Sequence, residues 1–430
     1  MRMEEMEQNS FISFVKIRDK KVILKLVIKN LLIYLLLCNF FCTFAANFKK
    51  SRAMNTPFMY GTAADAQHFT DRETERKRLQ LNFENGINTI IISPRRWGKT
   101  SLVYRVVEQM ANVAQIQIVR MDAFSVRTPE DFYRMFATEI IKQTSSRVEE
   151  WLDNAKRFLG SLVPVITPSA DPMNPVSLSL RSVGIKYEED VLLLPQRIAE
   201  EKGVHLLICI DEFQQIGEMS DTLSFQKKLR SIWQHQHSVS YCLYGSKRHM
   251  LMNMFGKRSA PFYKFGDMLF LERIPISYWR EYITPRFEQE SRHIDPKYID
   301  DIYAYVDGNS SYMQQLCWLV WARTNLEVTE EIVAEAKEDL LRQNHALFME
   351  QINGLSAYQI RFIRALLVGK AQEISRGATI EEFNLGSTAN IATIKKALQK
   401  KELIDIEGKD ICFSDPIFSH WLRKNSALID

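Results

Sequence analysis

The stretch INTIIISPRRWGKTSLV, residues 87–103, decides the fold of this chain of 430 residues. It begins with an apolar run rich in β-branched side chains, residues 89–92, which predicts a buried strand. A loop follows, and the sequence GKTS at residues 98–101 then opens an apolar helical pattern. Strand, loop and helix in this order are the parts of a phosphate-binding loop. Successive backbone N–H groups of such a loop, with the positive end of the following helix, make a concave anion site.

The residue types in this loop suit the phosphates of a nucleoside triphosphate. Gly98 lets the backbone approach the phosphates closely, Lys99 would reach the β- and γ-phosphates, and Thr100 would place its hydroxyl on Mg²⁺. The strict pattern G-x-x-x-x-G-K-[ST] has a glycine where this sequence has Ser93, so the motif is one residue short of complete. The alternative is a helix N-terminus that happens to read GKTS. We predict that the nucleotide is bound by Ser93, Pro94, Arg95, Arg96, Trp97, Gly98, Lys99, Thr100 and Ser101.

A second motif, VHLLICIDEF at residues 204–213, lies far downstream of the loop. Its apolar run ends in two carboxylates, which predicts a strand buried on both faces with acids at its carboxyl end. Asp211 would hold Mg²⁺ through water, and Glu212 would orient or deprotonate the attacking water. The alternative is an Asp-Glu cap that follows a core strand. Because the two motifs occur together and in order, we predict bound ATP with Mg²⁺, with Thr100 and Asp211 as the metal residues.

These motifs carry a family resemblance. The run PRRWGKTSLV, the IDEF strand end and the segment HFTDRETERKRL (residues 68–79) resemble the archaeal-type ATPases of the STAND branch of P-loop NTPases, relatives of the AAA+ class. Members carry a phenylalanine-x-x-arginine-glutamate element before the phosphate loop, matched here by Phe69, Arg72 and Glu73. The resemblance covers residues 54–430. It implies an ATP-driven switch whose partner is left open. It also implies that the segment before the phosphate loop, residues 55–86, approaches the adenine.

From residue 54 to residue 276 predicted strands and helices alternate, which indicates a parallel sheet covered on both faces. Besides the two motifs, we predict strands at residues 116–126, 239–245 and 267–274. Residues 163–183 are rich in proline and serine and show no periodicity. We predict a solvated loop there, with a segment that orders on a partner as the alternative.

Two further residues are candidates by resemblance to nucleotide switches. Ser246 follows the strand predicted at residues 239–245, where such proteins place a polar residue that senses the γ-phosphate; the alternative is a turn-capping serine. Arg258 would neutralise charge in the transition state, because the family often has an arginine after the helix that follows this strand. The alternative for Arg258 is a solvated basic loop.

Two smaller parts are predicted after the nucleotide domain. Residues 277–354 carry four helical patterns, and the resemblance implies a helical lid packed on the nucleotide. Residues 355–430 read as three helices and a hairpin, the order of a winged helix. Lysines at 395, 396, 400 and 401 make its third helix basic, so DNA is an alternative partner, but acidic residues follow at once and the module can instead pack on the ATPase core.

The first 53 residues do not fit this pattern. Basic residues precede a hydrophobic stretch of residues 31–46, which is shorter than the roughly twenty residues that span a bilayer comfortably. A signal peptide would carry an ATP site out of the cell. We favour an extension upstream of a true start at Met54, and a cytoplasm-facing membrane anchor is the alternative.

Composition agrees with a cytoplasmic protein. The chain is 46% apolar and 25% charged, and its net charge of +4 is too small to indicate nucleic acid by itself. Six cysteines without metal-ligand spacing indicate reduced thiols. We predict a slow ATPase that acts as a nucleotide-dependent switch on an unknown protein partner. The alternatives are an ATP-regulated DNA-binding protein of the replication-origin or transposition-helper type, and a nucleotide-gated scaffold with negligible turnover.

Overall fold

The protein is described here by a computed structural model. It describes residues 56–62, 64–65, 67–111, 113, 115–146, 150–151, 153–154, 157, 162–168, 176–182, 187–408 and 410–428. The predictions for residues 1–53 lie outside this part of the chain. Across the described ranges no helix combines the length and the apolar character that crossing a membrane requires.

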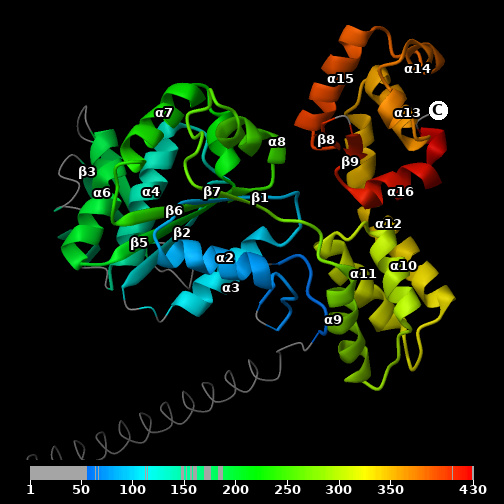
Figure 1. Cartoon of the computed structure of the whole chain (residues 1–430), viewed down its shortest axis with the longest axis horizontal. Coiled ribbons are helices and arrows are strands. Elements are labelled where there is room, and N and C mark those ends of the chain that lie inside the picture. The colour runs from blue at the N-terminus through cyan, green and yellow to red at the C-terminus, as the bar shows by residue number, and fades with distance from the viewer. Residues whose placement is uncertain are drawn as a thin grey trace, which may run out of the picture. The chain divides into compact units, whose positions relative to one another are not determined.

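A five-stranded parallel sheet organises the first part of the described chain, with the strand order β2-β5-β6-β1-β7 (Figure 1). Its strands are β1 (Thr89–Ile92), β2 (Ile116–Asp122), β5 (His205–Asp211), β6 (Val239–Gly245) and β7 (Asp267–Phe270). The predicted parallel sheet is therefore confirmed. Since all five strands run in one direction, the loops after β1, β5 and β6 emerge at the same edge.

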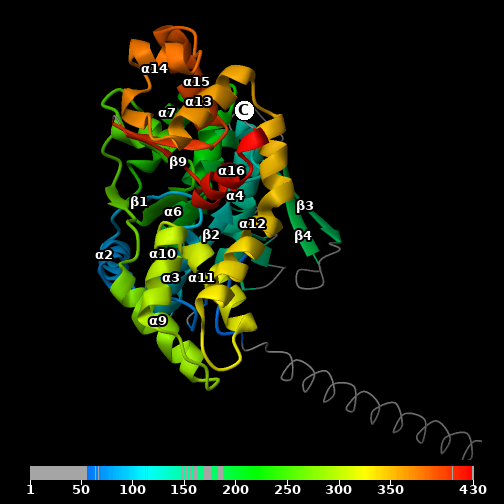
Figure 2. The ribbon, with the colours of Figure 1, turned by 90° about the vertical axis from the view of Figure 1, so that its right-hand side faces the viewer.

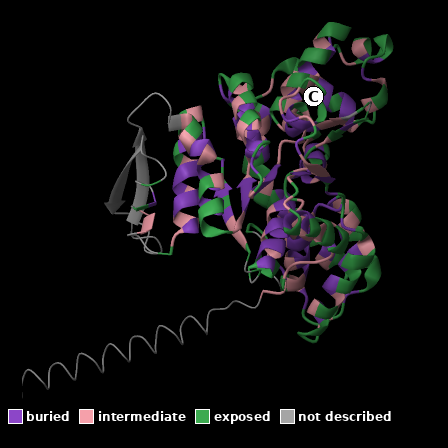
Figure 3. Cartoon of the chain, turned by 60° about the vertical axis from the view of Figure 1, so that its left-hand side comes forward, coloured by how far each residue is buried: buried purple, intermediate pink, exposed green. Residues whose placement is uncertain are grey.

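Helices cover both faces of this sheet (Figure 1). One face carries α2 (Glu73–Glu84) and α3 (Lys99–Met110), and the other carries α4 (Pro129–Thr144), α6 (Tyr187–Lys202) and α7 (Thr222–Trp233). Each face has its own cluster of buried side chains, so β1 and β5 are apolar on both sides, as their uninterrupted apolar runs predict. Figure 3 shows the buried residues on the strands and on the sides of the helices that face them.

Aromatic side chains fill the cluster under α4 and α7. Trp233 is 1% exposed and stacks on Tyr241 of β6 with ring centroids 4.1 Å apart. Phe213, which follows the two acids of β5, packs against Trp233 in the same cluster. This packing fixes the segment after β5, a 3₁₀ helix η1 (Phe213–Glu218), and so fixes the acids in front of it.

The loop predicted for residues 163–183 is wrong. The backbone there forms an antiparallel hairpin of β3 (Leu162–Pro168) and β4 (Val176–Ser182). Proline lacks the backbone N–H that a ladder needs, but it is tolerated in a strand where its nitrogen faces away from the partner. A two-stranded ladder leaves both outer edges unpaired, which gives prolines such positions.

Helices α9 (Ile276–Glu288), α10 (Pro296–Tyr305), α11 (Ser310–Arg323) and α12 (Glu330–Asn353) follow the sheet. The chain ends with α13 (Ala357–Leu367), α14 (Gly377–Glu382), α15 (Thr388–Lys400), β8 (Ile404–Glu407), β9 (Asp410–Phe413) and α16 (Pro416–Lys424). In this last part the helices α13, α14 and α15 precede the antiparallel pair of β8 and β9, and the winged helix stays a prediction. One cluster of buried residues runs through both groups, and α12 contacts α11 as well as α16 (Figure 2).

Candidate nucleotide site

The phosphate loop joins β1 to α3 with the backbone shape that its sequence requires. Gly98 precedes the first residue of α3 and has φ 84°, a left-handed conformation that glycine adopts without strain. Arg96 also has a positive φ, 67°. Ser93, where the strict motif has glycine, does not. Position 93 therefore accepts a side chain, which explains why the departure from the motif does not disturb the loop.

Lys99 lies inside the loop and is only 6% exposed. Its Nζ donates hydrogen bonds to the carbonyl oxygens of Pro94 at 3.2 Å and Ser93 at 3.4 Å. Burial lowers the pKa of Lys99 to about 8, although Glu212 and Asp211 act in the opposite direction. A buried ammonium with only two carbonyl partners has a strong electrostatic preference for an added anion.

The predicted metal residues meet. The Thr100 hydroxyl donates a hydrogen bond to Oδ2 of Asp211 at 2.8 Å, across the gap between the start of α3 and the end of β5. Burial raises the pKa of Asp211 to about 6, and the charge of Glu212 raises it further, while the hydrogen bond from Thr100 lowers it. A hard cation next to Asp211 would relieve both unfavourable effects, and oxygen atoms of this kind are what Mg²⁺ prefers.

Glu212 lies at the end of the acidic strand and reaches towards β6. It has φ 50°, and its Oε2 accepts a hydrogen bond from the Ser246 hydroxyl at 3.2 Å. Strand β6 lies between β1 and β5, which is why Ser246 can meet the acids of β5. A second donor, Nε2 of Gln214, also bonds to Oε2 of Glu212.

Gln214 is a member of the site that the sequence did not reveal. It is fully buried, and its Oε1 has no hydrogen-bond partner within the described structure. Gly245 makes room for it, because a Cβ at Gly245 would lie 1.7 Å from Oε1 of Gln214. Gln214 lies in η1 and Gly245 ends β6. A contact between one glutamine and one glycine so far apart leaves no periodic pattern in the sequence by which it could be predicted.

Arg258 is not brought to these residues. It is exposed in the segment after η2 (Met252–Gly256), and it has no hydrogen-bond or ion-pair partner among the described residues. Its proposed action on the transition state stays a prediction. Arg95 is also exposed, whereas Ser101 is buried within α3.

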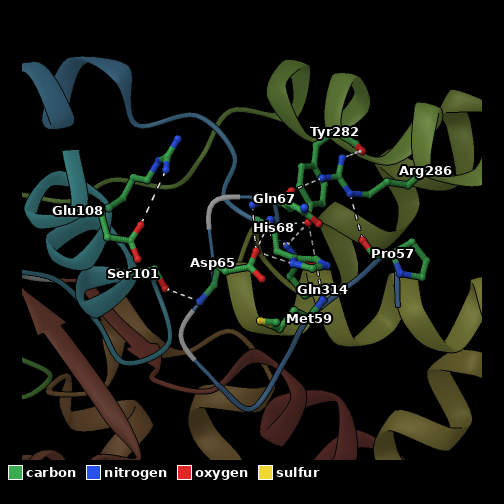
Figure 4. Close-up of polar contacts among 12 residues, drawn as sticks. Pro57, Met59, Asp65, Gln67, His68, Ser101, Glu108, Tyr282, Arg286 and Gln314 are labelled. Carbon is green, nitrogen blue, oxygen red and sulfur yellow. Dashed lines mark hydrogen bonds and ion pairs between the residues drawn. The ribbon is translucent and has the colours of Figure 1, made fainter. Parts of the chain in front are cut away.

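The lead is the segment before α2, described at residues 56–62, 64–65 and 67–72. It lies between the start of α3 and the helices after the sheet (Figure 4). The backbone N–H of Ala64 donates to Oγ of Ser101 at 2.9 Å, so this hydroxyl holds the lead. On the other side, Arg286 donates to the carbonyl oxygens of Pro57 and Gln67 at 3.1 Å and 2.5 Å, as drawn in Figure 4.

The element matched to the family, Phe69, Arg72 and Glu73, touches the phosphate loop through its arginine. Arg72 is 4% exposed, and its Nη2 donates to the carbonyl oxygen of Trp97 at 3.3 Å. Its Nη1 pairs with Glu75 at 2.9 Å. Phe69 packs against the cluster under α2 and α3. Arg72 therefore fastens the loop to α2.

The basic side of the third helix in the last part is less available than its sequence indicates. Nζ of Lys401 donates to the carbonyl oxygen of Gly354 at 3.0 Å. Partial burial lowers the pKa of Lys395. Lys396 and Lys400 are exposed on α15.

Mg²⁺ fits the residues present. Asp211 is a partly buried carboxylate whose pKa is raised by burial, so a cation beside it would offset this effect, and Thr100 already lies against it. The Lys99 ammonium and the free end of α3 supply the positive field for phosphates next to them.

Comparisons with solved structures agree with this geometry. The chain resembles a Walker-type ATPase of Pyrococcus abyssi with a TM-score of 0.60 and 16% sequence identity, over 85% of this chain and 99% of that one. It also resembles the ORC2 protein of Aeropyrum pernix, solved as ADPNP and ADP complexes, with a TM-score of 0.53 and 16% identity, over 86% of this chain and 98% of that one. No family model matches the sequence, and neither does any curated protein. This likeness extends to the fold, and the chain has the α/β fold of P-loop NTPases with a five-stranded parallel sheet.

Proposed function

We propose that this P-loop ATPase fold works as an ATP-binding switch with slow turnover. The observation that supports the proposal most is the meeting of five functional side chains at one edge of the sheet. Lys99 and Thr100 begin α3, Asp211 and Glu212 lie at the end of β5, and Ser246 directly follows β6. A phosphate-binding lysine, two side chains that bind one metal ion, a carboxylate for the attacking water and a hydroxyl are groups suited to hydrolysis of a nucleoside triphosphate.

Each side chain has a chemical role in this proposal. Lys99 neutralises the β- and γ-phosphates, and Thr100 and Asp211 hold Mg²⁺, directly or through water. The bound metal would neutralise charge that develops on the phosphate oxygens. Glu212 accepts the proton of the attacking water, whose oxygen bonds to the γ-phosphorus while the bond to the bridging oxygen breaks and ADP leaves.

The proposal assigns Glu212 a position that Ser246 and Gln214 control. Both donate to the same oxygen, Oε2, so in this structure that oxygen is held by two protein donors. Glu212 must release at least one of these partners before Oε2 can accept a proton from water. With Oε2 held in this way, the proton goes either to Oε1, the other carboxylate oxygen, or to Oε2 after the site rearranges, and the second route is slow.

The experiment compares Glu212→Gln and Lys99→Ala with the wild type. Glu212→Gln keeps Lys99, Thr100 and Asp211, so it should bind ATP with Mg²⁺ normally while single-turnover hydrolysis falls by about 10² to 10⁴. Lys99→Ala should lose binding because the charge on the phosphates is gone. Binding is measured by calorimetry and hydrolysis by product release in a single turnover.

Three outcomes separate the alternatives. If Glu212→Gln hydrolyses ATP as fast as the wild type, Glu212 only caps η1 and the proposed base is wrong. If Lys99→Ala binds ATP as tightly as the wild type, the nucleotide site itself is wrong. Tight retention of ATP by a wild type that does not hydrolyse it would select the nucleotide-gated scaffold over the ATPase.

A further inference from the structure

Arg96 of the phosphate loop takes part in a chain of hydrogen bonds that leaves the nucleotide site. Its Nη1 donates to the Tyr312 hydroxyl at 2.8 Å, and this hydroxyl donates to Oδ2 of Asp415 at 2.6 Å. The guanidinium also lies over the Tyr312 ring, 5.2 Å from its centroid. Tyr312 is 1% exposed, so the connection between an arginine and a carboxylate passes through a buried phenol.

Both ends of this chain are tied to backbone. The carbonyl oxygen of Arg96 accepts a hydrogen bond from the backbone N–H of Ser311 at 3.3 Å, at the start of α11. At the other end, Oδ1 of Asp415 caps α16 by accepting from the N–H groups of Ile417 at 2.9 Å and Phe418 at 3.3 Å. A movement of the loop at Arg96 is therefore transmitted to α11 and to the first turn of α16.

Phosphates would compete for the same arginine. Lys99 donates to two carbonyl oxygens of the loop, those of Ser93 and Pro94, and it would give up these bonds to contact phosphates. The loop that carries Arg96 then loses internal support. Triphosphate oxygens next to the loop also attract the guanidinium more strongly than a carboxylate reached through a tyrosine, because the charge is larger and direct.

A second set of contacts joins the same two regions. Lys247 and Arg248 directly follow Ser246, the residue that contacts Glu212. Lys247 pairs with Glu402 at 3.4 Å, and Arg248 lies 4.0 Å from Asp405 on β8. Residues 93–97, residues 246–249 and the hairpin of β8 and β9 line one cavity of about 1200 Å³. The last part of the chain is thus linked to the nucleotide site in two places. One link runs from Asp415 through Tyr312 to Arg96, and the other is formed by the ion pairs of Lys247 and Arg248.

We propose that Tyr312 and Asp415 are positioning residues of the phosphate loop, and that ATP binding withdraws Arg96 from them and loosens α16. This inference rests on the proposed ATP site. In this structure the relay Arg96–Tyr312–Asp415 connects the phosphate loop through α11 to the first turn of α16. With ATP bound, Arg96 turns to the phosphates and this connection is released, so that α16 and the adjacent hairpin become available to a partner.

Hydrogen exchange of the α16 amides with and without an unhydrolysed ATP analogue and Mg²⁺ tests the relay. In the wild type, exchange in α16 should increase on addition of the analogue. Tyr312→Phe removes one hydroxyl and keeps the ring, so α16 should exchange faster before nucleotide is added and should respond little to it. Tyr305→Phe is the matched control, since Tyr305 also contacts α16, by stacking on His420 with ring centroids 4.1 Å apart, but lies outside the relay.

Asp415→Asn separates the relay from the helix cap. Asparagine caps a helix about as well as aspartate, so α16 should remain capped while the charge that competes for Arg96 is gone. We expect ATP to bind about three- to tenfold more tightly to Asp415→Asn than to the wild type. Asp415→Ala also removes the cap of α16, so part of its faster hydrogen exchange would come from the lost cap. Comparison with Asp415→Asn, which keeps the cap, separates this part from the loss of the relay.

Two results would overturn the inference. One is a wild type that binds the analogue with no change, or with added protection, in α16. The other is a Tyr312→Phe protein that matches Tyr305→Phe in exchange and in ATP affinity. A different result, no calorimetric ATP binding in the wild type, would instead remove the proposed ATP site, and the relay would fall with it.

Discussion

The charge of Lys99 makes a sharp prediction about pH. Burial lowers its pKa to about 8, and phosphates bind the charged form. A group with this pKa is about 90% charged at pH 7 and about 10% charged at pH 9. The dissociation constant of ATP should therefore rise about tenfold from pH 7 to pH 9, since apparent affinity scales with the competent fraction.

The same reasoning predicts proton uptake. Phosphates next to Lys99 stabilise the ammonium, so its pKa rises on binding and the complex holds a proton that the free protein has lost. Calorimetry near pH 8.5 in two buffers with different ionisation enthalpies measures this uptake directly. The phosphates of ATP are already ionised in this range and do not contribute.

Lys99→Arg is the control for all other titrating groups. Arginine stays charged throughout this range, so the affinity of this variant should be independent of pH between 7 and 9. Equal affinity of the wild type at pH 7 and pH 9 would refute the prediction. So would a tenfold loss shared by the arginine variant, because the titrating group would then lie elsewhere.

Two further predictions concern the acids. Gly245→Ala places a Cβ 1.7 Å from Oε1 of Gln214, so the Gln214 amide must shift and its hydrogen bond to Glu212 is disturbed. Single-turnover hydrolysis should change while calorimetric ATP affinity stays within about twofold. Unchanged hydrolysis would show that Gln214 does not position the base. Burial raises the pKa of Asp211 to about 6, and Mg²⁺ binds the deprotonated form, so the Mg²⁺ concentration for half-maximal ATP binding should rise about tenfold from pH 7 to pH 5. Asp211→Asn cannot titrate and should lose this dependence. A pH effect that persists in Asp211→Asn would show that another group titrates.

The sheet and its phosphate loop could be predicted because their signals are local. A run rich in β-branched residues predicts β1, the apolar run VSYCLYG predicts β6, and the Thr128 cap with Pro129 marks where α4 begins. The hairpin of β3 and β4 was missed. Residues 176–182, VSLSLRS, alternate with the period of a strand, but the nearby prolines favoured a loop.

The contacts between distant segments could not be predicted, because they depend on which elements the fold brings together. Asp415 precedes Pro416 and is recognisable as a helix cap, yet nothing local says that its second oxygen receives Tyr312. Gln214 likewise becomes a partner of Glu212 only because β6 has a glycine at the position facing it. The sequence marks the chemical groups, and the packing decides their partners.

The strand order gives the proposed link between phosphate binding and the last part of the chain a second route. Because β6 lies between β1 and β5, the residue after β6 is the one that meets the acids, and it is Ser246. The next residue, Lys247, pairs with Glu218 after β5 and with Glu402 beside the hairpin. A shift of the chain at Ser246 that frees Glu212 for water therefore also moves Lys247 and alters its two ion pairs. Conversely, a partner that pulls the hairpin away would release Lys247 and allow Ser246 to leave Glu212, so a partner could raise the rate of hydrolysis without touching the nucleotide.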